Sequence, residues 1–177
     1  LLARIKGLEE KYTGEAIQDV NSDIRITGLR ILRERGMDVI SAVKKLVNDS
    51  DPAVHRECAI ALRHNESPEA PALWTRLAQH HDGNDRWYLE ALGLGMDRQQ
   101  DKFFGAWLET VGSEWNSKAG RDIVWRSRTR KTSELLVKII LDEKTSDEVK
   151  PRFIRALDFQ SGPEKEAALL KLIGSGS

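Results

Sequence analysis

The sequence predicts an all-α fold, a right-handed α-solenoid of about five helical hairpins. Two apolar patterns alternate along the chain and each returns after roughly thirty residues, which is typical of stacked helical units. Apolar residues almost never alternate with period two, the pattern of a half-buried strand, so no β-sheet is expected.

The second helix of each hairpin is marked by four apolar residues at positions i, i+1, i+4 and i+5. Side chains at this spacing share one helical face, so each such helix is expected to be buried on that face. The five copies start 31, 30, 32 and 33 residues apart. They are Ala42-Val43/Leu46-Val47, Leu73-Trp74/Leu77-Ala78, Phe103-Phe104/Trp107-Leu108, Leu135-Leu136/Ile139-Ile140 and Ala168-Leu169/Leu172-Ile173.

The first helix of each hairpin is marked by apolar or small residues at positions i, i+4 and i+8. A small residue in the middle lets a neighbouring helix approach closely. The copy before residues 135–140 is the least clear, and its helix is expected to run to about Trp125. The copies are Ile24/Gly28/Leu32, Val54/Cys58/Leu62, Trp87/Ala91/Gly95, Trp115/Ala119/Ile123 and Val149/Phe153/Leu157.

Helix-start signals agree with these patterns. Asp51-Pro52 is typical of an N-cap followed by proline at the first helical position, and Ser67-Pro68 and Gly162-Pro163 also precede predicted helices. Residues 1–20 are expected to form an N-terminal cap helix. The whole of 1–173 is predicted to be one domain, followed by a linker or tail at 174–177.

Composition limits the function classes. Among 177 residues, Lys plus Arg and Asp plus Glu both total 28, and this zero net charge disfavours a nucleic-acid partner. No apolar run approaches the roughly 20 residues that span a bilayer, so no membrane insertion is expected. The one cysteine, Cys58, excludes a disulfide framework and a C-x-x-C-H haem attachment within this sequence. Because the sequence begins at Leu1 without methionine, we expect it to be a fragment of a longer protein.

The paired helices, with Asp-Pro-x-Val-x-Arg at 51–56, resemble HEAT repeats of the short form seen in phycobilisome-lyase-like proteins. The resemblance covers nearly the whole chain and implies an armadillo-type superhelix. Such superhelices serve many roles, most often as interaction scaffolds.

Three stretches carry a narrower resemblance: DRWYLEALGLG (85–95), DIVWRSR (122–128) and RFIRALDFQ (152–160). They resemble the HEAT segment of large planctomycete-type proteins that join a sugar-dehydrogenase-like propeller to a c-type cytochrome domain. This resemblance implies an exported or periplasmic, haem-bearing parent dehydrogenase; without it the chain would be expected in the cytoplasm. The family's catalytic and haem-binding residues have no counterparts here, so no cofactor is expected in this fragment.

A basic stretch follows the fourth first-helix pattern. The turns inside the hairpins are basic and the turns between them acidic, which helix dipoles alone can explain. The alternative is a docking edge for a protein or a flanking domain of the same chain. Its residues are Trp125, Arg126, Arg128, Arg130 and Lys131.

No catalytic or metal-binding residue is predicted. His80, His81 and Asp82 are interpreted as a solvated helix end, and Cys58 as a buried, unreactive thiol. Trp74, Trp87 and Trp107 fall on predicted core positions, as does Trp115.

The sequence therefore predicts a monomeric, non-catalytic scaffold for protein or interdomain contacts. The alternative is a DNA-binding protein that resembles the HEAT-like alkylpurine DNA glycosylases, which use Trp, Asp and Arg on a concave basic surface. Strong retention on heparin that fades steeply with salt would favour this alternative.

Overall fold

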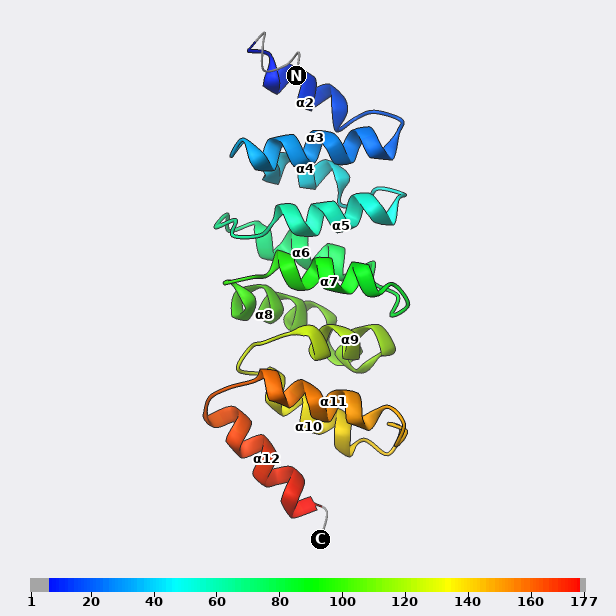
Figure 1. Ribbon diagram of the computed structural model, residues 1–177, viewed down its shortest axis with the longest axis vertical. Coiled ribbons are helices and arrows are strands. Elements are labelled where there is room, and N and C mark those ends of the chain that lie inside the picture. The colour runs from blue at the N-terminus through cyan, green and yellow to red at the C-terminus, as the bar shows by residue number, and fades with distance from the viewer. Residues whose placement is uncertain (1–6, 176–177) are drawn as a thin grey trace.

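The computed structural model describes residues 7–175, and all of their regular elements are helices. The predicted all-α class and the absence of strands are confirmed for these residues. The α-helices, shown in Figure 1, are α2 (Glu9–Ala16), α3 (Ser22–Glu34), α4 (Val39–Leu46), α5 (Pro52–Ala61), α6 (Ala70–Gln79), α7 (Arg86–Gly95), α8 (Gln100–Val111), α9 (Lys118–Arg126), α10 (Thr132–Leu141), α11 (Lys150–Ala156) and α12 (Pro163–Ser175). Two 3₁₀-helices, η1 (Gly112–Asn116) and η2 (Leu157–Phe159), follow α8 and α11.

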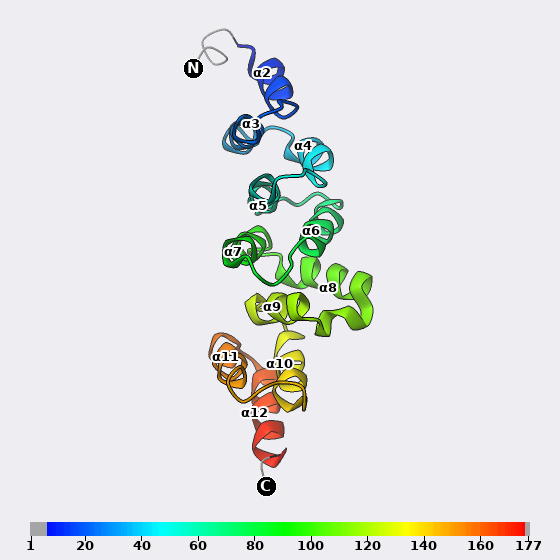
Figure 2. The ribbon, with the colours of Figure 1, turned by 90° about the vertical axis from the view of Figure 1, so that its right-hand side faces the viewer.

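The helices form two columns along an elongated molecule, with the termini at opposite ends (Figures 1 and 2). In the first column, α3, α5, α7, α9 and α11 contact one another in succession. In the second, α4 contacts α6, α6 contacts α8, and α10 contacts α12. Helices with the two apolar patterns thus alternate between the columns.

Four helices of the first column, α3, α5, α7 and α9, begin at side-chain caps, whereas α11 has none. Asp51 accepts a hydrogen bond from Ala53 N at 2.8 Å, and Asp85 accepts one from Tyr88 N at 3.0 Å. Asn21 and Ser117 cap α3 and α9 in the same way. Each cap satisfies a backbone N–H that the helix leaves free, so these polar residues fix where the column helices start.

The four-residue patterns form the core of the second column. All four members are buried in α4, α6 and α10, and in α8 only Leu108 is half-buried. Trp74 is fully buried, and its indole N–H donates to the carbonyl oxygen of Leu92 at 3.0 Å. The copy in α12 differs, because Leu169 and Ile173 are exposed.

Small residues set the spacing of the first column. Gly95 lies against the backbone of α5, where an added Cβ would overlap the carbonyl oxygen of Ala59. Cys58, in the middle of α5, is completely buried, and burial raises the pKa of its thiol. The predicted buried thiol is confirmed.

Ion pairs link helices of the first column to the acidic turns that follow them in the chain. Arg25 of α3 reaches Asp49 at 2.7 Å, Arg56 of α5 reaches Asp85 at 2.8 Å, and Arg121 of α9 pairs with Asp142. In each pair an arginine of a first-column helix meets an aspartate of the next acidic turn. The acidic turns that the sequence predicted are therefore partly neutralised by arginines of the same chain.

Several predicted positions need correction. Ile24, Trp87 and Val149, each the first member of its three-residue pattern, are exposed rather than buried. Trp115 is half-buried on η1, because α9 starts only at Lys118. Of the predicted cap helix, α2 covers residues 9–16 and residues 1–6 lie outside the described part. α12 runs to Ser175, two residues into the predicted tail.

Candidate docking face

The predicted docking residues start at the end of α9 and continue to α10 through a rigid turn. The hydroxyls of Ser127 and Thr132 lie 2.6 Å apart, and Thr129 N donates to Thr132 Oγ1 at 3.0 Å. The side-chain amide of Gln160 donates to the carbonyl oxygen of Ser127 at 3.1 Å. Because these groups are buried and hydrogen-bonded to one another, the turn holds its flanking side chains in fixed positions.

Trp125 is half-buried between two guanidinium groups. Arg86 of α7 lies with Cζ 5.4 Å from the centre of its ring, and Arg152 of α11 lies 4.5 Å from it. Both distances fall in the range of cation–π attraction. Arg152 also pairs with Asp122 at 2.6 Å, so three successive first-column helices meet around one indole.

Arg126 is paired within the molecule. Its Nε donates to Glu90 Oε2 of α7 at 2.8 Å, and Arg86 reaches the other oxygen of Glu90 at the same distance. Burial opposes ionisation of Glu90, but the hydrogen bonds from the two arginines outweigh it and lower the pKa of Glu90. Gly93 leaves room for Arg126, because a Cβ there would overlap the guanidinium group.

Arg128 has no carboxylate partner among the described residues. It donates to the carbonyl oxygens of Trp125 at 2.9 Å and Ser127 at 2.6 Å, and its Cζ lies 4.9 Å from the ring centre of Phe159. Burial, and then the charge of Arg126, lower the pKa of Arg128. This arginine therefore hydrogen-bonds carbonyl oxygens at the C-terminal end of α9, where they lack partners within the helix.

Arg130 and Lys131 lie apart from this cluster. Both are exposed and border a cavity of about 400 Å³ between α10 and α12, together with Glu134 and Lys171. The backbone N–H of Arg130 lies 3.3 Å from Asp101 Oδ1 of α8. The five predicted residues thus divide between two surfaces.

The tertiary structure adds residues that the sequence analysis missed. Trp87 is 75% exposed beside Arg86, and Phe159 is 57% exposed beneath Arg128. Trp87 and Glu90, three positions apart, lie on neighbouring parts of the same helical face of α7. We define the tryptophan–arginine face as Arg86, Trp87, Trp125, Arg126, Arg128, Arg152 and Phe159.

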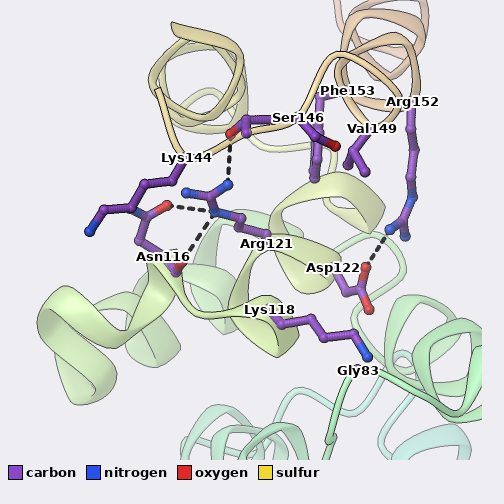
Figure 3. Close-up of a pocket in the computed structure, with 11 residues that line it drawn as sticks. Gly83, Asn116, Lys118, Arg121, Asp122, Lys144, Ser146, Val149, Arg152 and Phe153 are labelled. Atoms are coloured by element: carbon purple, nitrogen blue, oxygen red, sulfur yellow. Dashed lines mark hydrogen bonds and ion pairs between the residues drawn. The ribbon is translucent and has the colours of Figure 1, made fainter. Parts of the chain in front are cut away.

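A cationic cavity of about 460 Å³ lies beside this face, between α9 and the segment that leads into α11 (Figure 3). Arg121 is held in its wall, donating to Asn116 Oδ1 at 2.9 Å and to Thr145 Oγ1 at 2.7 Å. Lys118 points toward Gly83 (Figure 3), and its Nζ donates to the side-chain amide oxygen of Asn84. The cations diverge around the cavity, and its one lining carboxylate, Asp122, is paired with Arg152.

The two histidines at the end of α6 differ in burial, since His80 is exposed and His81 is buried. His55 and His80 stack with ring centres 4.3 Å apart, and His80 Nε2 lies 3.0 Å from the carbonyl oxygen of Val47. His81 is buried against Tyr88 and lies 3.4 Å from Asp122. The predicted solvated helix end is wrong for His81, because this ring fills the gap between α7 and α9. Within residues 7–175, no three His, Cys, Asp or Glu side chains are grouped to hold a metal ion.

Comparison with family models, curated proteins and solved structures found no match to this chain. The described helices include none long and apolar enough to cross a bilayer.

Proposed function

We propose that the chain is a non-catalytic scaffold of the HEAT type, a right-handed, armadillo-type superhelix, that binds a protein partner or a flanking domain. The tryptophan–arginine face is the proposed contact surface. The observation that carries this proposal is the pair of tryptophans on the neighbouring helices α7 and α9: Trp87 is open to solvent, and Trp125 is contacted by the guanidinium groups of Arg86 and Arg152. Tryptophan and arginine are the residues most enriched at the energetic centres of protein interfaces.

The charge of the face indicates the kind of partner. Four arginines (Arg86, Arg126, Arg128 and Arg152) stand against two acids, Glu90 and Asp122, which leaves a local excess of two positive charges. This small excess of positive charge suits an acidic protein surface rather than a run of phosphates. An acidic, aromatic-containing surface is therefore the expected counterpart.

A peptide selection tests this proposal. Random peptides displayed on phage and selected against the chain are expected to be rich in Asp and Glu. Their binding is expected to weaken about 30-fold in Trp87→Ser, equivalent to about 2 kcal/mol for a central interface residue. Because Trp87 is largely exposed, this variant is expected to keep the melting temperature of the parent chain.

Tyr12→Ser is the matched control, since Tyr12 is 37% exposed on α2 at the other end of the molecule. Equal binding by both variants would contradict the proposed face. Tight retention on heparin or duplex DNA, with a steep loss at raised salt, would instead support the DNA-binding alternative.

The wider assignment, to a haem-bearing parent dehydrogenase of the planctomycete type, rests on the sequence resemblance alone. It would place the haem and the catalytic residues outside this chain and the whole protein in an exported or periplasmic location. The complete reading frame of the gene tests it, since a C-x-x-C-H motif and propeller strands would be required.

A further inference from the structure

Among the described residues, the end of the molecule formed by α11 and α12 lacks cover at two positions of the second-column pattern that the earlier copies bury, apart from Leu108 of α8, which is half-buried. The second member of the pattern is at most 1% exposed as Val43, Trp74, Phe104 and Leu136, but 40% exposed as Leu169. The fourth member is at most 7% exposed as Val47, Ala78 and Ile140, but 72% exposed as Ile173.

The first column shows the same loss of burial at this end of the molecule. The residue after the middle member of the three-residue pattern is at most 1% exposed as Leu29, Ala59 and Leu92. Its counterpart in α11, Ile154, is 50% exposed. Both columns therefore lose cover in the same hairpin, which a local distortion of one helix would not produce.

The opposite end is finished differently. There α2 packs on α3, and its exposed residues include Glu10, Lys11 and Glu15. A stack of repeats needs a polar outer face at a closed end. On α12, the exposed residues Leu169, Leu170 and Ile173 give the end an apolar surface instead.

We propose that the α11–α12 end is a docking face for one further helical hairpin of this chain's own repeat type, which would continue both columns. Its chemistry is indicated by α10, the preceding helix of the second column. Leu136 and Ile140 of α10 occupy the positions of Leu169 and Ile173, with the same residue types, and are buried within the stack. The occupant is thus an amphipathic hairpin that covers a Leu/Ile pair, and the proposal does not depend on the tryptophan–arginine face.

A chain extended by its own hairpin tests this docking. A copy of residues 141–173 is joined directly after Ile173, so that Ile173 is followed by the segment that follows Ile140. Ile173→Cys in the original α12 is then alkylated with and without the extension. Cys58 gives no background, because it is fully buried.

Alkylation of the Ile173→Cys thiol is expected to slow at least about tenfold in the extended chain, since reaction then requires local opening. Leu169→Cys, which leaves Ile173 intact, is expected to slow likewise. Lys171→Cys is the matched control, because the residues at its position in α6 and α10, Arg76 and Lys138, stay exposed in the stack. Its rate is expected to be the same in both chains.

An unchanged rate at both Ile173→Cys and Leu169→Cys would overturn the proposal, and so would equal slowing at Lys171→Cys. Protection that appears in the unextended chain and grows with protein concentration would also overturn it. In that case the occupant would be a second copy of the chain, which sedimentation velocity would register as a dimer.

Discussion

Replacement of Gly95 by alanine sets two opposing effects against each other. Gly95 is the last residue of α7, and it lies against the backbone of α5. An added Cβ would overlap the carbonyl oxygen of Ala59 and would lie 3.4 Å from Trp74 Cδ1. Alanine also has the higher helix propensity, by up to about 1 kcal/mol relative to glycine.

The overlap is expected to win. Inserting a methyl group into a packed core costs about 1–3 kcal/mol, and a backbone carbonyl cannot rotate away as a side chain can. Because the overlap is with a backbone atom, the cost is taken from the upper part of that range, about 2–3 kcal/mol. After a propensity gain of about 1 kcal/mol is subtracted, Gly95→Ala is expected to lower the free energy of unfolding by about 1–2 kcal/mol. Gly105→Ala, inside α8, supplies the control, because a Cβ there meets no atom within 4 Å. It is expected to raise stability by up to about 1 kcal/mol.

Urea titrations followed by circular dichroism would measure both variants beside the parent chain. The reasoning requires shifts of opposite sign at the two glycines. A Gly95→Ala chain as stable as the parent, or stabilised like Gly105→Ala, would refute the close approach of α5 and α7.

Two further predictions concern a core ring and a buried histidine. Phe153 is 2% exposed, so Phe153→Ala is expected to cost about 3–5 kcal/mol in a urea titration, whereas Leu170→Ala, at a 71% exposed position, is expected to cost under about 0.5 kcal/mol. Burial, and then the facing His80, lower the pKa of His55 despite Asp49 and Asp51 nearby, so the folded chain binds this proton less readily than the unfolded chain does. The stabilising contribution of neutral His55 is therefore complete above the unfolded histidine pKa of about 6.5 and is lost as the pH falls below it. Between pH 7.5 and 5.5, the free energy of unfolding is expected to fall less in His55→Gln than in the parent chain. An identical fall in both chains would exclude this role for His55.

The two apolar patterns differed in how well they located buried residues, and helix geometry explains why. Residues at i, i+1, i+4 and i+5 mark both borders of the buried stripe of a helix, and all four are buried in α4, α6 and α10. Three residues at i, i+4 and i+8 advance by 400° a step at 3.6 residues per turn, so they drift 40° each time. In three copies the first member of the pattern falls at the edge of the stripe, as Ile24, Trp87 and Val149 do, whereas Val54 in α5 is fully buried.

The contacts of the candidate face could not be predicted in the same way. They depend on the register between helices far apart in sequence: Arg126 meets Glu90, and Trp125 meets Arg152. The one local sign that Trp87 would be exposed was its neighbour Tyr88, which could take the buried position instead. Tyr88 takes the inner position because its hydroxyl donates to the carbonyl oxygen of Leu77 at 2.9 Å.

The basic stretch at 126–131 shows that positive charges clustered in the sequence do not by themselves make a positively charged surface. Arg126 is neutralised by Glu90, and Arg128 is bound to carbonyl oxygens at the end of α9, as the helix-dipole interpretation expects. Among the described residues, the side chains of Arg130 and Lys131 have no carboxylate partner, and they line a different cavity. The concentration of aromatic and cationic side chains arises instead where α7, α9 and α11 meet around Trp125. A docking partner would therefore contact a site to which three neighbouring helices, α7, α9 and α11, all contribute. Local unfolding of any one of these helices would be expected to weaken binding.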